Sequence, residues 1–90
     1  MEDNVILIGS KPFGRYLTSA IMSFTKDGKD KVIIKARGHN ITKAVDIAET
    51  AKRKLTEENL KTEVIIGNEE KEGKENRPIN VSTIEITLSK

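Results

Sequence analysis

Aliphatic runs and stretches with helical spacing alternate along the first half of the chain. Residues 5–8 form a continuous aliphatic run closed by Gly9, which is the pattern of a strand buried on both faces. Residues 31–37 predict a second strand, which ends at Gly38. The residues that predict a helix between them are Pro12, suited to a first turn, then Leu17, Ala20, Ile21 and Phe24 at helical spacing, and the terminating segment Lys26–Gly28. A right-handed parallel crossover should join the two strands.

The second half of the chain predicts one long helix and two more strands. Asn40 is a favourable N-cap, and the apolar residues that follow at steps of three and four are Ile41, Ala44, Val45, Ala48, Ala51 and Leu55. Residues 64–66 and 81–88 predict strands. Residues 69–78 carry no apolar side chain to bury, so we expect a flexible hairpin tip at about residues 69–79.

The predicted order of elements is therefore βαβαββ. A chain of 90 residues is enough for one core, and we expect a single domain over residues 1–90. The fold class that fits this order is α/β, of the two-layer α+β kind, in which a four-stranded mixed sheet packs against two helices.

Composition excludes several kinds of site. No cysteine and one histidine leave no disulfide, thiolate zinc site or histidine pair, and we expect no metal, no cofactor and no enzyme activity. The longest apolar run, residues 5–8, is far shorter than the roughly 20 residues that cross a bilayer. The acidic start, residues 1–4, lacks the cationic region of a secretion signal. We therefore expect a cytoplasmic protein without a membrane span.

Charge is distributed unevenly along the chain. The formal net charge is only +2, yet residues 10–43 hold eight lysines and arginines against two aspartates. Residues 44–70 reverse the balance, with seven acidic and four basic residues. One part of the folded surface is therefore expected to be strongly basic.

The first loop, residues 9–14, lies between a predicted strand and helix, where phosphate-binding loops occur. A nucleotide P-loop needs Lys and then Ser or Thr after its second glycine, but Arg15 and Tyr16 stand there, and Pro12 removes a backbone donor. Nucleotide hydrolysis is therefore not expected. Lys11 and the helix N-terminus could hold a nucleic-acid phosphate instead. A tight turn with a solvated lysine is the alternative.

The second loop, residues 35–40, also follows a strand, so we expect it at the same sheet edge as the first loop. The residues gathered there would be Lys11, either Lys35 or Arg37, Lys43, and the hydrogen-bonding His39 and Asn40. His39 has no partner in the sequence and is more typical of a polar surface residue than of a ligand or base. Aromatic residues make up only 3% of the chain, which disfavours base stacking on the sheet. We expect Phe24 in the core, and either Phe13 or Tyr16 can lie exposed near the basic edge.

Four segments in this order resemble the Alba family of small archaeal chromatin proteins. They are Asn4–Gly9 with Lys11–Pro12, Val32–Gly38, Ile41–Asp46 and Asn80–Ile86. The resemblance implies a βαβαββ fold like that of a translation initiation factor C-terminal domain and a homodimer. It also implies binding to double-stranded DNA and RNA with little sequence preference, in association with the chromosome.

The resemblance also assigns residues. It places Lys11 and Arg37 on the central nucleic-acid surface of the dimer, supported by Lys35 and Lys43, and Arg77 on a hairpin arm that follows a minor groove. We expect the same surface to include Arg15, Tyr16, His39, Asn40 and, on the hairpin, Lys74.

The chain departs from the family at three positions. Family members often carry two lysines before the proline, the first an acetylation target, and here Ser10 precedes Lys11, the remaining candidate for acetylation. Many have arginine in place of His39, so we expect lower or pH-dependent affinity near neutral pH. Leu55 stands where an aromatic residue supports contacts between dimers, which predicts weaker cooperative coating of DNA.

Three functions compete on this sequence: an architectural protein that coats DNA, an RNA-binding protein acting in RNA stabilisation or as a ribonucleoprotein subunit, and a small hydrolase or regulatory subunit. The last is the weakest because the chain lacks a nucleophile–base pair, a metal cluster and a nucleotide loop. For the first two, the expected mechanism is counterion release: basic loops neutralise phosphates while the hairpin arms embrace the duplex.

Overall fold

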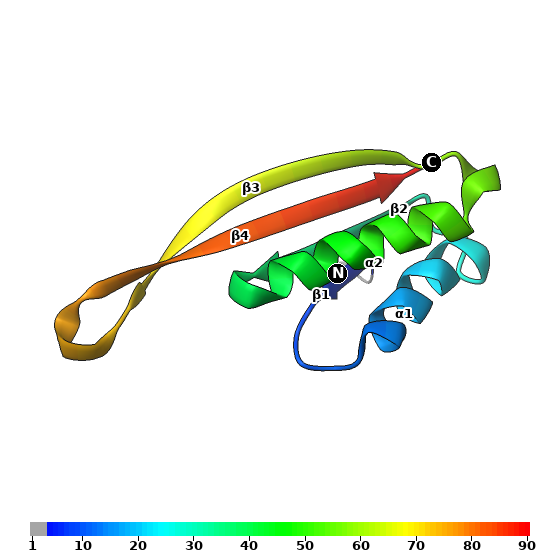
Figure 1. The fold of residues 1–90 in the computed structure, drawn as a ribbon. Helices are drawn as coiled ribbons and strands as arrows, with labels where there is room; N and C mark the ends of the chain where they lie inside the picture. Colours follow the sequence, from blue (N-terminus) through cyan, green and yellow to red (C-terminus); the bar gives the residue numbers. More distant parts are fainter. Residues whose placement is uncertain (1–3) are drawn as a thin grey trace.

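The predicted order of elements is confirmed (Figure 1). The computed structural model describes residues 4–90, with Asn76 described by its backbone alone. The elements are β1 (Val5–Leu7), α1 (Phe13–Thr25), β2 (Lys31–Arg37), α2 (Ile41–Lys54), β3 (Lys61–Glu72) and β4 (Pro78–Ser89). Three short 3-10 helices, η1 (Gly38–Asn40), η2 (Thr56–Glu58) and η3 (Lys74–Asn76), lie in the connections. Residues 1–3 of the acidic start lie outside the described residues.

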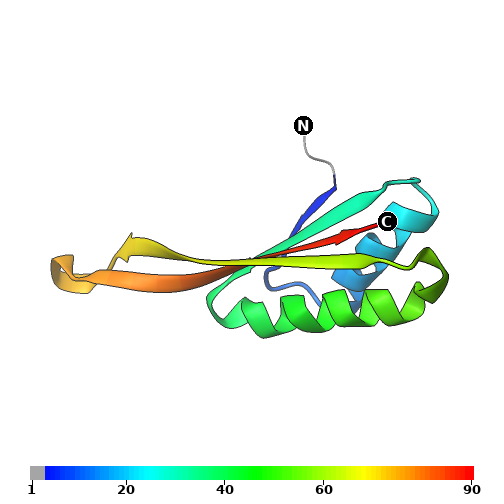
Figure 2. The same ribbon diagram turned by 90° about the horizontal axis from the view of Figure 1, so that it is seen from above.

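The four strands form one mixed sheet in the order β1-β2-β4-β3. β1 and β2 are parallel, with Val5 opposite Ile33, and β4 pairs antiparallel with both β2 and β3. Ile86 in the middle of β4 stands opposite Ile34 on one side and Val64 on the other. Both helices cover the same face of this sheet, as Figure 2 shows from above. The fold is therefore the two-layer α+β arrangement that the sequence predicts.

The core lies between this face and the two helices. Side chains of a strand alternate between faces, and on β2 every second residue is buried. α2 turns a stripe of small residues toward the sheet, which allows a close approach, and α1 contributes Phe24 as the sequence predicts. The buried residues of this core are Ile8, Tyr16, Ala20, Phe24, Val32, Ile34, Ala36, Ala44, Ile47, Ala48, Ala51, Leu55, Ile86 and Leu88.

The opposite face of the sheet carries no helix, and we call it the open face. Leu7 is 71% exposed there. The expectation that residues 5–8 form a strand buried on both faces is therefore wrong for this chain. β1 is a three-residue edge strand, and only Ile8, just after it, is fully buried and donates its N–H to the Lys35 carbonyl at 2.9 Å.

Asn40 is the N-cap residue of α2, as predicted, but its backbone angles are helical and its side chain makes no capping hydrogen bond. Gly38, whose φ is +60°, turns the chain into η1 directly after β2. The helical path therefore begins three residues before Ile41. Pro12 stands one position before α1 in an extended conformation, where its missing N–H costs nothing.

The β3–β4 hairpin is much longer than predicted. The two strands pair without interruption from Lys61 opposite Ser89 to Glu72 opposite Pro78, where the sequence predicted only residues 64–66 and 81–88. Residues 69–72 and 78–79 are therefore strand, and the tip consists of residues 73–77. Beyond Thr83, the last partner of β2, the hairpin leaves the body as a two-stranded arm, residues 68–82. It gives the molecule extents of 51 × 25 × 23 Å (Figure 1).

Candidate nucleic-acid interface

The first loop is held in place by the hydroxyl of Tyr16. This oxygen accepts hydrogen bonds from the backbone N–H groups of Gly9 at 2.9 Å and Lys11 at 3.2 Å. Tyr16 lies on the face of α1 that packs into the core and is only 8% exposed. The ring is buried and the hydroxyl already accepts these two hydrogen bonds, so a direct contact of Tyr16 with nucleic acid stays a prediction. Tyr16 positions the loop, and two backbone donors that a phosphate-binding loop would use are already taken.

Lys43 fastens the first loop from the other side. Its Nζ donates to the carbonyl oxygens of Gly9 at 2.9 Å and Lys11 at 2.8 Å, and lies 5.4 Å from the centre of the Tyr16 ring. Lys43 comes from the first turn of α2, directly after the second loop. The expectation that the two loops meet at one edge of the sheet is therefore confirmed. The ammonium group itself is engaged with the protein, which makes Lys43 a support for the loop.

Two cations in and beside the first loop are exposed to solvent. Lys11 lies in the loop and Arg15 on the first turn of α1, which contains no acidic residue. Both line a groove of about 550 Å³ between β1 and α1, together with Ser19 and Met22. Phe13 is partly exposed at the start of the same helix. Two positive side chains at a helix N-terminus can attract a phosphate.

The cations at the end of β2 are paired with carboxylates. Lys35 Nζ lies 3.4 Å from Glu85 Oε1 on β4, and Arg37 Nη1 donates to Glu69 Oε1 on β3 at 2.8 Å. All four side chains are partly exposed on the open face. The uneven charge along the sequence predicted a strongly basic segment but did not reveal these ion pairs, because the glutamates come from strands more than 30 residues away in the chain. Only the register of the sheet brings them together.

The open face between these pairs is hollowed. A groove of about 500 Å³ is lined by Leu7, Lys35, Arg37, Ile65, Ile66 and Glu69, among others. β3 forms the far edge, and its aliphatic residues are exposed on both faces, with Ile66 at 78%. The sequence predicted the strand at residues 64–66 but not its exposure, since three successive aliphatic residues read equally well as a covered strand.

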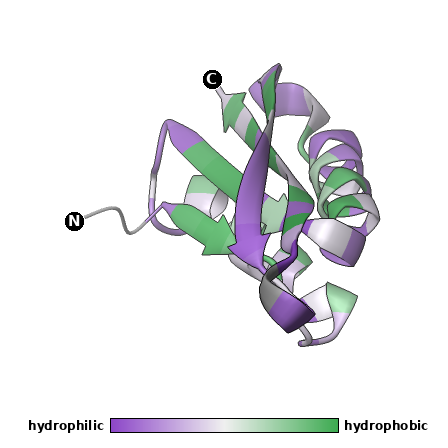
Figure 3. Cartoon of the chain, turned by 90° about the vertical axis from the view of Figure 1, so that its left-hand side faces the viewer, coloured by the Kyte–Doolittle hydropathy of each residue, from purple (hydrophilic) through white to green (hydrophobic). Residues whose placement is uncertain are grey.

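The remaining predicted residues fall in two places. His39 is exposed and Asn40 half-buried in η1, beside the two loops. Lys74 and Arg77 are exposed at the far tip of the arm, away from the loops. Figure 3, which looks along the arm, shows the mostly hydrophilic arm in front of the hydrophobic strands of the body. The structure therefore brings the loop cations together and leaves a second, separate pair of cations at the tip.

Leu55 does not lie on the surface. It is 5% exposed at the end of α2 and belongs to the core of its own chain. Its role as a contact between dimers stays a prediction, and in this structure the side chain packs within its own core.

Within residues 4–90, no group of three or more acidic, histidine or cysteine residues is arranged to hold a metal ion. In the same range, no helix is long and apolar enough to cross a membrane.

Comparison with known proteins identifies the family. The family model of Alba matches residues 4–67. A DNA/RNA-binding protein Alba from Methanococcus maripaludis is 36% identical over 88 residues, which cover 98% of this chain and 99% of that protein. One from Thermoplasma volcanium is 40% identical over 89 residues, covering 99% and 98%. The solved structure of Alba from Thermoplasma volcanium matches with a TM-score of 0.85 and 40% identity, covering 97% of this chain and 100% of that one. This chain belongs to the Alba family.

Proposed function

We propose that this protein binds double-stranded DNA and RNA with little sequence preference, by contacts to the phosphate backbone. The observation that carries the proposal is the meeting of the first and second loops at one edge of the sheet, fastened by Lys43. Lys11 and Arg15 stand exposed beside that junction, and Arg37 lies at the end of β2. The names of the relatives, DNA/RNA-binding proteins, support the same assignment.

Phosphate contacts account for a lack of sequence preference. Base edges in the major groove are read by a helix or ribbon that presents Arg, Asn or Gln side chains. The exposed cations at this edge of the sheet lie on a loop, a helix N-terminus and a strand end, which favours contacts to the backbone. Each lysine or arginine that neutralises a phosphate releases a bound counterion, so affinity should fall steeply with salt.

A second copy of the chain is part of the proposal. The aliphatic residues Val64, Ile65 and Ile66 on the edge strand β3 are at least half exposed, which is unusual for a chain that stays single. Covering them with the same strand of a second copy would remove this apolar surface from water and close the sheet edge. The resulting dimer would carry two basic edges and two arms, and the arms with Lys74 and Arg77 would reach along the minor groove. On a chromosome such a dimer would act as an architectural protein.

The proposal is tested by measuring affinity for duplexes of equal length across a salt series, together with the mass of the free protein in solution. Two unrelated DNA sequences and the matching RNA duplex are compared. Similar affinity for both DNA sequences, a steep loss with salt and the mass of a dimer are the expected results. A clear RNA preference would favour a role in RNA stabilisation or in a ribonucleoprotein. No binding to any duplex at low salt would refute the nucleic-acid function.

A further inference from the structure

An ion pair connects the body of the protein to the base of its arm. Arg37 is the last residue of β2 and stands opposite Thr83 of β4, whose other neighbour is Gly67 of β3. Glu69 lies two residues further along β3, on the same face as Gly67 because strand side chains alternate. The Arg37 side chain therefore reaches across β4 to donate its hydrogen bond to Glu69, at 2.8 Å. Gly67 leaves this path free of a side chain on β3.

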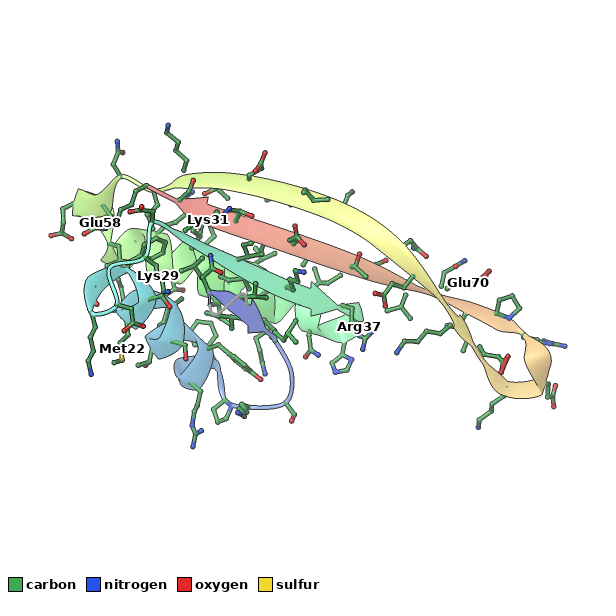
Figure 4. The ribbon with its side chains drawn as sticks, turned by 180° about the vertical axis from the view of Figure 1, so that it is seen from behind. Met22, Lys29, Lys31, Arg37, Glu58 and Glu70 are labelled. Atoms are coloured by element: carbon green, nitrogen blue, oxygen red, sulfur yellow. The ribbon has the colours of Figure 1, made fainter. Side chains whose placement is uncertain are left out.

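The Arg37–Glu69 ion pair is exposed to solvent, so another anion can replace the Glu69 carboxylate. About half of each side chain is in contact with solvent, 56% for Arg37 and 50% for Glu69. Carboxylate and phosphate oxygens use the same donors of a guanidinium group, so one can replace the other. Figure 4 shows Arg37 at the end of β2, where the arm begins. A duplex that engages the loops and the arm together would bring phosphates to this place.

We propose that Glu69 occupies the phosphate-binding group of Arg37 and must be displaced before Arg37 can bind a nucleic acid. Glu69 is thus an affinity-lowering residue built into the interface. This inference rests on the proposed function and adds to it a competitor from the protein itself. An anion that reaches Arg37 alone gains little by the exchange, whereas a duplex that also contacts Lys11 and Arg15 is held nearby while the exchange takes place.

The size of the effect follows from the exposure of the pair. Exposed ion pairs are weak, so removing the competitor should raise affinity by about two- to fivefold per chain. Salt dependence should change as well. In the wild type, the Arg37–phosphate contact releases one counterion from the nucleic acid. The Glu69 carboxylate, no longer paired with Arg37, takes up one counterion, and the two effects on the salt dependence cancel. Without that carboxylate, the plot of log affinity against log salt should become steeper by about one per Arg37–phosphate contact.

Glu70 provides the matched control. It precedes Lys71 on the same strand but stands opposite Asn80 and points to the other face of the arm, so it faces away from Arg37 (Figure 4). Changing Glu70 to Gln removes the same charge at nearly the same distance from a bound duplex. Any general gain from a less acidic arm will appear equally in Glu69→Gln and Glu70→Gln. The difference between the two variants therefore measures the pairing with Arg37.

The experiment measures duplex DNA affinity over a salt series for Glu69→Gln, Glu69→Ala and Glu70→Gln, each with Arg37 present and with Arg37→Ala. We expect both Glu69 variants to bind more tightly than Glu70→Gln, with a steeper salt slope, and we expect this advantage to vanish with Arg37→Ala. The alanine variant excludes a residual hydrogen bond from the amide. Equal gains at positions 69 and 70, or a Glu69 gain that persists with Arg37→Ala, would overturn the inference while leaving the proposed function intact. A wild type that binds no duplex would overturn both.

Discussion

Replacing Tyr16 with Phe tests how the first loop is held. The substitution keeps the buried ring and removes only the hydroxyl, the acceptor for the Gly9 and Lys11 N–H groups at 2.9 and 3.2 Å. A hydrogen bond contributes about 1 kcal/mol net, and both donors lie in a part-buried region where water replaces the acceptor incompletely. We therefore expect the free energy of unfolding to fall by about 1–2 kcal/mol. For a domain of this size, this corresponds to a Tm lower by about 4–16 °C.

The assay is denaturant unfolding at one fixed protein concentration, because dimer formation would make stability depend on concentration. Amide hydrogen exchange provides the local test. The Gly9 and Lys11 amides should lose protection in Tyr16→Phe, whereas the Ile8 amide, which donates to the Lys35 carbonyl at 2.9 Å, should keep it. Duplex affinity should also fall, since Lys11 is no longer held in place. Unchanged stability together with unchanged exchange at Gly9 and Lys11 would refute the role assigned to the hydroxyl.

Three further substitutions have clear expected outcomes. Lys43→Met removes two hydrogen bonds to the first loop and should lower both the free energy of unfolding and the duplex affinity. Lys54→Met, at the other end of α2, should leave the free energy of unfolding nearly unchanged. Equal losses of stability in the two variants would contradict the role of Lys43 in holding the loop. Ile66→Lys places a charge on the exposed edge of β3 and should convert a dimer into a folded single chain. The expected readout is a halved mass with an unchanged circular dichroism spectrum. A retained dimer would exclude this edge as the interface. Gly73→Ala places a Cβ 2.6 Å from backbone and side-chain atoms at the tip and should destabilise the hairpin by about 1–3 kcal/mol. Gly14→Ala in α1 meets no atom within 4 Å and should stabilise the protein by about 0.5 kcal/mol. A change in stability of the same sign in both variants would contradict the geometry of the tip.

The body of the fold could be predicted because its apolar pattern is regular. β2 alternates buried and half-buried residues, and the apolar stripe of α2 recurs at helical spacing, so both elements were placed within a residue of their ends. The arm could not be predicted in this way. Residues 68–72 carry no apolar side chain, and there the strands are joined by backbone hydrogen bonds, which do not depend on the kind of side chain. The extension of β3 to Glu72 therefore leaves no hydrophobic signal in the sequence.

The sequence predicted where the candidate site lies in the fold, but it did not predict the contacts that its side chains make. The meeting of the two loops followed from the parallel pairing of β1 and β2, which sequence order implies. The burial of Leu55 agrees with its place in the apolar stripe of α2, whereas Tyr16 in the first turn of α1 carries a polar hydroxyl, and its burial was left open by the sequence. The partner of Arg37, Glu69, depended on a register across three strands. Contacts of that kind are set by tertiary pairing and have no local pattern.

The most direct test of the account is the salt dependence of duplex binding for the double variant Lys11→Ala, Arg37→Ala. Each cation that contacts a phosphate contributes about one to the slope of log affinity against log salt. We expect the double variant to bind every duplex more weakly, with a slope lower by about one per chain, because Lys11 contributes about one and the contribution of Arg37 is offset by the counterion that Glu69 takes up. Lys54→Ala, which removes a similar charge at the far end of α2, should change neither markedly. An unchanged slope and affinity in the double variant would contradict the claim that this edge of the sheet binds the nucleic-acid backbone.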